Sequence, residues 1–443
     1  MKLIDNCKNH LVDSVRREIP RLAALLEDKT LFNLEQKGIF VFPELIKDAE
    51  DLTGDQIVLQ KVDDYYCTGN VMGYLGCGSE QMTISSRFSE GETDFLFQYL
   101  LEKVLDIPNI FNLHVQINQK ERVQDLLIFL FPMYLRKAMR KGIYKTYINR
   151  NYNSANVRGR INVECHIKQN TPFTGKVAYS QREFSYDNNL MELIRHTIEF
   201  VKTKSYHLAI ASKIREEASS VIEVTKGYNF YDRRKIVLEN KQNPVRHAYY
   251  REYRQLQLLC IMILQYDRHQ FGEGSKEVNG ILFDGAWLWE EYINLLIKDS
   301  FYHPQNKGGK GAQRLFLSAS SGRQLGLIYP DFISRDCTNR IIADAKYKPI
   351  ENIGNRDYLQ VLAYMFRFDA SRGFYLYPEN GEKHIEKFNL QKGTTYEKNV
   401  TTREEIEVKK IGLLIPRNCE RYSEFVDLIK VNEKIFISEI LDE

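Results

Sequence analysis

The spacing of hydrophobic and polar residues changes along the chain and divides it into three regions. Short apolar or alternating runs typical of strands come first, at residues 38–42, 56–60 and 82–87. Apolar residues at helical intervals follow, at residues 123–141, 190–203, 208–221 and 249–266. The pattern predicts a mixed or β-rich N-terminal domain over residues 1–122 and a mainly helical middle region over residues 123–275.

The last region, residues 276–443, mixes both spacings. Two helical stretches, residues 286–297 and 357–368, enclose three strand-like runs, and a fourth run follows the second helix. The four runs lie at residues 314–319, 325–333, 340–346 and 373–377. After a loop-like stretch at 393–407, residues 410–415 have the pattern of another buried strand. We therefore expect an α/β domain with helices flanking a mixed β-sheet, and an α+β chain overall.

Two carboxylates and a lysine fall at the predicted strand ends of this region. Asp331 follows a Tyr-Pro pair, and Asp344 and Lys346 close an apolar run. A turn at residues 336–339 would make the two strands a hairpin and bring both carboxylates to one end of it. Lys346 would share a pleat face with Asp344, because side chains two apart on a strand point the same way.

This set of residues suits metal-assisted hydrolysis of a phosphodiester. Carboxylate oxygens are the ligands that Mg²⁺ prefers, Mn²⁺ accepts the same donors, and the backbone carbonyl of Ala345 could add another ligand. The Lys346 ammonium could then serve the attacking water. Each piece alone also has an ordinary explanation, since Asp-x-Lys is common at solvated strand edges and Pro-Asp is common in turns.

Both predicted helices of this region could support such a site. Glu290 on the first helix would offer a third carboxylate, with a solvated helix face as the alternative. Gln360 and Tyr364 lie four apart on the second helix and therefore share a face. They could contact a phosphate or a catalytic neighbour, with ordinary helix packing as the alternative.

Together these motifs resemble the PD-(D/E)xK nuclease fold in its RecB-like form. The resemblance rests on Pro-Asp at Asp331, Asp-Ala-Lys ending at Lys346, and Gln-x-x-x-Tyr ending at Tyr364. Similarity to McrC, the nuclease subunit of McrBC modification-dependent restriction systems, is carried by residues 283–292, 344–348 and 357–364. A looser likeness extends to residues 157–161 and 184–188.

The resemblance implies a Mg²⁺-dependent endonuclease subunit that cuts double-stranded DNA together with an McrB-like AAA+ GTPase. We expect the N-terminal domain, residues 1–122, to bind a partner. The chain has no Gly-x-x-x-x-Gly-Lys-Ser/Thr loop, so we expect it to bind no nucleotide alone. Removing Asp331 or Lys346 is then expected to abolish cleavage and to leave folding nearly intact. Two alternatives stay open: a stand-alone RecB-like DNA exonuclease with the same catalytic residues, and a non-catalytic adaptor of an AAA+ partner.

Composition agrees with a large intracellular protein. The chain has 443 residues, 43% of them hydrophobic, which is enough for two or three domains. It contains no apolar run of about 18 residues and no signal-like apolar segment at its start, so we expect a cytoplasmic protein without membrane contact. Its 7 cysteines include no Cys-x-x-Cys pair and are expected to be reduced thiols.

The net charge of +3 says little, whereas the distribution of charge says more. Residues 136–160 are rich in Lys and Arg and contain no Asp or Glu. The candidate DNA-binding residues there are Arg136, Arg140, Arg158 and Arg160, interleaved with Tyr144, Tyr147 and Tyr152. An exposed helix face and a contact with a partner protein are the alternatives. A glycine-rich loop with Lys307 and Lys310 is a second candidate for contact with the DNA backbone.

Overall fold

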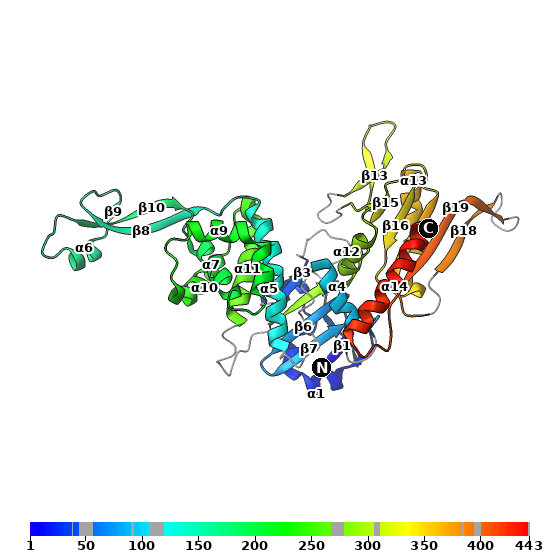
Figure 1. Cartoon of the computed structure of the whole chain (residues 1–443), viewed down its shortest axis with the longest axis horizontal. Coiled ribbons are helices and arrows are strands. Elements are labelled where there is room, and N and C mark those ends of the chain that lie inside the picture. Colours follow the sequence, from blue (N-terminus) through cyan, green and yellow to red (C-terminus); the bar gives the residue numbers. More distant parts are fainter. Residues whose placement is uncertain are drawn as a thin grey trace. The chain divides into compact units, whose positions relative to one another are not determined.

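A computed structural model of the chain describes residues 1–37, 39–43, 56–89, 93–105, 119–266, 279–304, 311–381, 385–393 and 400–441. The chain forms two compact units (Figure 1). The first unit combines Met1–Gln119 with Gly274–Glu443, and the second is Lys120–Glu273. No helix within the described ranges is both long enough and apolar enough to cross a membrane.

The N-terminal and C-terminal regions, expected as separate domains over 1–122 and 276–443, belong to one unit. The reason is strand β11 (Asn279–Asp284), which lies inside the N-terminal sheet. It pairs in parallel with β3 (Ile39–Phe42) and in antiparallel with β6 (Val71–Cys77). The second unit keeps nearly the boundaries predicted for the middle region.

Glycines allow β6 and β11 to approach closely. Gly73 has a φ of +152°, and a Cβ atom at this position would lie 2.1 Å from the carbonyl oxygen of Ile281. A Cβ atom at Gly280 would lie 2.4 Å from the carbonyl oxygen of Tyr74. Any larger residue would push the two strands apart, so the pairing depends on glycine at both positions.

The N-terminal part of the first unit is a five-stranded sheet in the order β1-β7-β6-β11-β3. The strands not yet bounded are β1 (Lys2–Ile4) and β7 (Glu80–Ser85). Three short helices accompany the sheet: α1 (Val12–Glu18), α2 (Pro20–Leu26) and α3 (Leu31–Gln36). A small second sheet contains β2 (His10–Leu11), β4 (Leu59–Val62) and β5 (Tyr65–Thr68).

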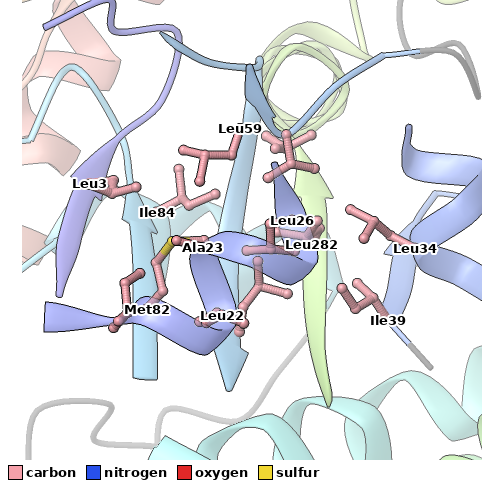
Figure 2. Close-up of a cluster of buried hydrophobic side chains, with 14 of the residues drawn as sticks. Leu3, Leu22, Ala23, Leu26, Leu34, Ile39, Leu59, Met82, Ile84 and Leu282 are labelled. Carbon is pink, nitrogen blue, oxygen red and sulfur yellow. The ribbon is translucent and has the colours of Figure 1, made fainter. Parts of the chain in front are cut away.

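Helix α2 packs on this sheet through its apolar side chains (Figure 2). Leu22 and Leu26 of the helix share one buried cluster with Met82 and Ile84 of β7 and with Leu282 of β11. All five side chains are removed from water, and each contributes about 1.5–3 kcal/mol relative to an exposed position. A residue from the late part of the sequence thus helps to form the N-terminal core.

The second sheet of this unit has six strands in the order β12-β15-β16-β17-β19-β18. They are β12 (Phe301–Tyr302), β15 (Phe332–Ser334), β16 (Ile341–Ala345), β17 (Arg372–Glu379), β18 (Ile385–Gly393) and β19 (Val400–Leu414). The helices around it are α4 (Phe95–Leu105), α12 (Gly285–Ile297), η4 (Ile350–Asn352), α13 (Asn355–Phe368) and α14 (Tyr422–Leu441). The sheet contains both parallel and antiparallel pairs, so the expected mixed sheet with flanking helices is confirmed.

Two of the predicted boundaries in this region differ from the structure. The single strand expected at 325–333 is two strands, because β14 (Gln324–Ile328) pairs with β13 (Gln313–Leu317) in a separate hairpin before the chain bends at Asp331. The stretch 400–407, expected as loop, is the first half of β19. This half of β19 pairs with β18 at the edge of the sheet, and most of its polar side chains face solvent. A strand of this kind has few apolar residues, so the spacing of apolar residues did not reveal it.

The second unit is mainly helical, as predicted. Its helices are α5 (Gln119–Met139), α7 (Asn189–Val201), α8 (His207–Lys213), α9 (Arg215–Val224), α10 (Arg233–Gln242) and α11 (Arg251–Tyr266), with short turns η1 (Phe230–Asp232) and η2 (Ala248–Tyr250). A long hairpin of β8 (Thr146–Ser154) and β10 (Val177–Ser185) extends from these helices (Figure 1). Its far end carries β9 (Arg160–Ile161) and α6 (Val163–Gln169), and we call these four elements the arm.

Candidate active site

Asp331 and Asp344 come together at one end of the β15–β16 hairpin. The two strands are antiparallel, with Phe332 opposite Ala343, so Asp331 immediately precedes the paired residues. The Asp331 Oδ2 atom accepts a hydrogen bond of 2.9 Å from the Ala345 backbone N–H. Asp344 points from the adjacent position of β16 and is buried. The sheet therefore fixes both carboxylates through backbone pairing.

Lys346 completes the cluster on the same pleat face as Asp344. Its Nζ lies 2.6 Å from Asp344 Oδ2, and the two side chains are 16% and 1% exposed. The Lys346 backbone N–H donates to the Leu376 carbonyl of β17 at 2.9 Å. That carbonyl also accepts the indole N–H of Trp289 at 3.0 Å, so helix α12 is anchored at the same point. The lysine backbone and helix α12 are therefore held by the same carbonyl of β17.

Helix α12 brings a third carboxylate near the pair. Negative charge at Glu290 acts directly on Asp331, and the Glu290 Oε1 atom lies 3.7 Å from Nε2 of His303. His303 donates from Nδ1 to the backbone carbonyl of Asp331 at 2.9 Å and stacks on Phe332, with ring centroids 5.0 Å apart. His303 thus links the helix to the residue that bears the carboxylate.

The protonation equilibria follow from this crowding of acids. Burial, together with the nearby Glu290 and Asp344 carboxylates, raises the pKa of Asp331 well above its usual range. For Lys346, burial favours the neutral amine, but the negative charges of Asp344 and Asp331 outweigh it and raise the lysine pKa above its usual value. Lys346 is therefore a charged hydrogen-bond donor at neutral pH.

Helix α13 contributes the two polar residues predicted from the sequence. Gln360 accepts a hydrogen bond of 3.3 Å from Lys346 Nζ and donates one of 2.6 Å to the hydroxyl of Tyr364. Burial raises the pKa of Tyr364 to about 12, so its hydroxyl stays protonated. On a neighbouring face of this helix, Val361 and Met365 pack into a buried cluster to which Tyr364 also belongs. This packing sets the direction in which Gln360 points.

A second lysine and its carboxylate partner border the site, and sequence reasoning assigned neither a role. Lys348 Nζ contacts both oxygens of Asp357, at 2.7 and 2.9 Å. Asp357 also accepts the Gly354 N–H at 3.0 Å, at the start of α13, and lies 3.6 Å from Lys346 Nζ. The available signal was an acidic residue in the first turn of an amphipathic helix, three positions before Gln360.

Tyr347 ties the site to the N-terminal part of the same unit. It lies between the two lysines in sequence, and its buried hydroxyl is 2.6 Å from Ser86 Oγ and 3.4 Å from Met72 Sδ. The Arg87 guanidinium lies 4.8 Å from the centre of the Tyr347 ring and forms an ion pair of 2.8 Å with buried Asp5. The β16 end is therefore positioned by residues near the start of the chain.

The basic residues predicted to bind DNA do not join this cluster. Arg136 and Arg140 lie at the end of α5, and Arg158 and Arg160 lie on the arm, all in the second unit. All four side chains are exposed. The structure thus divides the expected stripe between a helix end and the arm. Lys307 and Lys310 lie outside the described residues.

The tyrosines interleaved with these arginines contact other side chains of the second unit. Tyr144 packs against Tyr253, with ring centroids 5.6 Å apart, and Tyr152 stacks on Tyr179 at 5.5 Å. Tyr147 is exposed but lies beneath the Arg182 guanidinium at 4.5 Å. The structure therefore does not form a row of free aromatic rings along this basic stretch.

The donor set defines which metal ions the site could accept. Among the described residues, no group of three His, Cys, Asp or Glu side chains is arranged to hold a metal. The N–H and C=O groups of a strand residue point to the same edge, so the Ala345 carbonyl faces the side on which its N–H meets Asp331. Two carboxylates and a carbonyl are an oxygen set of the kind that suits Mg²⁺ with several waters.

Fold and site together define an α/β protein with two carboxylates and a lysine at one end of a β-hairpin. A search for curated relatives matches no protein. The family model described as "McrBC 5-methylcytosine restriction system component" matches residues 67–378. The chain belongs to this family, and the resemblance to McrBC systems inferred from its motifs is confirmed.

Two solved structures from Thermococcus gammatolerans are similar to the chain. The first is a refined half-complex from a tetradecameric assembly of McrB AAA+ hexamers with bound McrC, with 14% identity, a TM-score of 0.45 and 99% of each chain covered. The second is an McrBC complex, with 12% identity and a TM-score of 0.29, covering 67% of this chain and 87% of the other.

Proposed function

We propose that the chain is the DNA-cutting subunit of an McrBC-type restriction system, an endodeoxyribonuclease that depends on Mg²⁺ or Mn²⁺. The observation that carries this proposal is the contact of 2.6 Å between Lys346 Nζ and Asp344 Oδ2, beside the Asp331 carboxylate. A structural ion pair has no need of a second and a third carboxylate crowded beside its own. A phosphodiester site with a divalent cation does.

The repulsion between the acids supports a metal at this place. Burial and the charges of Glu290 and Asp344 make ionised Asp331 unfavourable in the protein alone. A divalent cation between Asp331 and Asp344, with the Ala345 carbonyl as a further ligand, would relieve that repulsion. When bound, Mg²⁺ would polarise a phosphoryl oxygen and make a nearby water more acidic.

The residues of the chain then have separate roles in hydrolysis. A water oxygen bonds to phosphorus, one ester P–O bond breaks, and the leaving oxygen takes a proton. Lys346 keeps its proton, because nearby carboxylates outweigh the effect of burial on its pKa, so it orients the water or stabilises charge on the phosphate. Gln360 holds the ammonium through its 3.3 Å hydrogen bond, and His303 fixes the backbone of Asp331.

An AAA+ GTPase partner belongs to the proposal because the chain has no phosphate-binding loop of its own. The arm of the second unit is the surface that we assign to this partner. Large apolar side chains are exposed towards its far end, including Val163 at 63% and Phe173 at 70%. Apolar surface favours a protein over the phosphates of DNA. Arg158 and Arg160 would then contact acidic groups of the partner.

Cleavage of covalently closed circular DNA tests this function directly. With Mg²⁺, GTP and an McrB-like AAA+ partner, the chain is expected to convert methylated circular DNA into nicked or linear product. An endonuclease needs no DNA end, whereas the exonuclease alternative would degrade only linear substrate. Degradation of linear DNA alone, without need for GTP or partner, would overturn the proposed class.

Metal binding should be visible without cleavage. Mg²⁺ or Mn²⁺ at about 100 times its Kd is expected to stabilise the wild-type protein by about 2.7 kcal/mol. The effect should grow as pH rises, because metal displaces a proton from Asp331, whose pKa is raised. The double variant Asp331→Asn/Asp344→Asn should lose this stabilisation by metal, and the variant of an exposed residue, Asp299→Asn, should keep it. Equal stabilisation of all three proteins would place the metal elsewhere.

A further inference from the structure

A cleft of about 430 Å³ opens beside the candidate active site. Its walls come from the segment that follows β16 and from the first turns of α13. The polar side chains used below are Lys346, Lys348, Asn352, Asn355, Arg356 and Gln360. Its size is within the range of pockets that bind small molecules or single nucleotide units. Lys346 and Gln360 belong both to this cleft and to the active site, so the two are continuous.

The cleft has excess positive charge. Lys346 is balanced by Asp344 and Lys348 by Asp357, through contacts of 2.6 and 2.7 Å. Arg356 is exposed and makes no ion pair with a described residue. One guanidinium therefore remains available to a ligand, with two ordered ammonium groups beside it.

The chemistry of the walls selects the ligand class. Besides these cations the cleft is lined by side-chain amides, which donate to phosphate oxygens, by Gly354, and by Asp357, whose charge is paired with Lys348. None of its lining residues is aromatic. A nucleobase would find no ring to stack on. The start of α13 is not itself the attraction, because the Gly354 N–H is already bound by Asp357 at 3.0 Å. The side-chain cations and amides define an anion site suited to phosphate.

We propose that this cleft binds the backbone phosphate next to the scissile one in the DNA strand that is cut, with Arg356 as its main contact. This inference rests on the proposed nuclease function, because only a nuclease has a scissile phosphate. Lys346 borders both positions, so one strand can pass from the cleft to Asp331 and Asp344 without leaving protein donors. The cleft would thus set where along the strand the cut falls, without reading its bases.

Equilibrium DNA binding tests the proposal in a background that cannot cut. All proteins are full-length and carry Asp331→Asn, and each is titrated with a fluorescent 30-base-pair duplex at several salt concentrations. Adding Arg356→Ala is expected to weaken binding by about three- to tenfold and to reduce the slope of log K against log salt by about 1. Arg356→Lys should keep the slope. Exposed Arg421→Ala, just before α14, is the matched loss of one charge and should change neither quantity.

Each outcome of this experiment decides the proposal. Equal affinity and equal slope for Arg356→Ala and Arg421→Ala would overturn it. Binding of GTP that is lost in Arg356→Ala, together with duplex binding that is unchanged in the same variant, would also overturn it, because the cleft would then serve a free nucleotide. No cleavage is measured here, so failure of the nuclease proposal would appear in the circular-DNA experiment and leave these binding constants unaffected.

Discussion

Replacing Asp331 with asparagine is expected to lower the rate of DNA cleavage by about a thousandfold, the scale seen when one transition-state-stabilising group is lost. Asparagine keeps the oxygen that can accept the Ala345 N–H but removes the negative charge that would hold a divalent cation. Lys346→Ala should have a loss of similar size, because it removes the donor that lies 2.6 Å from Asp344. Rates are compared on circular DNA with partner, GTP and Mg²⁺ at saturation.

The two variants should differ in stability, which separates a chemical effect from unfolding. Asp331→Asn is expected to be at least as stable as wild type, since burial and nearby acids raise the pKa of Asp331 and make its charge unfavourable. Lys346→Ala leaves Asp344, which is 1% exposed, without its cation, so nearly intact folding is expected only for the Asp331 variant. Undiminished cleavage by both proteins would contradict the mechanism.

Arg87→Ala is expected to destabilise the first unit by about 3–5 kcal/mol, because it leaves a buried carboxylate without its counterion. The Asp5 side chain is fully buried and accepts from Arg87 Nη2 at 2.8 Å and from Nε at 3.1 Å. Urea unfolding followed by tryptophan fluorescence measures this unit alone, since both tryptophans of the chain, Trp287 and Trp289, lie in α12. Arg403→Ala, which breaks the exposed pair with Glu405, should cost less than about 1 kcal/mol.

The pH dependence of this deficit gives a second test. Burial raises the pKa of Asp5 from 3.8 to about 6, although Arg87 lowers it. Protonated Asp5 therefore favours the folded state, and this contribution is complete below pH 3.8 and is lost as pH rises through about 6. The loss grows without Arg87, so the deficit of Arg87→Ala should be larger at pH 8 than at pH 5. Adding Asp5→Asn should restore part of it, and no recovery would show that charge is not the cause.

The sequence identified the pair of carboxylates and the lysine because their arrangement depends on local rules. Side chains two apart on a strand share a face, and a short turn returns a hairpin beside itself, so Asp344, Lys346 and Asp331 had to meet once the strands were recognised. Gln360 and Tyr364 followed from helical spacing in the same way. The roles assigned to all these residues stay predictions.

Other parts of the site depend on contacts between distant segments, which no local pattern reveals. His303 reaches Asp331 only because β12 pairs with β15, and Arg87 reaches Tyr347 only because β11 joins the N-terminal sheet. Conversely, the basic residues at 136–160 are neighbours in sequence but are divided in space, because the chain leaves α5 and extends into the arm. Counting basic residues along the sequence assumes that they lie on one surface, whereas the fold places these residues on a helix end and on the arm.

The place of β11 has a consequence for the order of events on the ribosome. This strand lies between β3 and β6 in the sheet, yet about 200 residues separate it from β6, so the whole helical unit is synthesised before it emerges. Until then β3 has no partner in that sheet and the N-terminal core lacks Leu282. The strands that carry the candidate active site, β15 and β16, emerge later still. A nascent chain therefore finishes the helical second unit first, and a chain that stops before β11 contains none of the residues of the candidate active site.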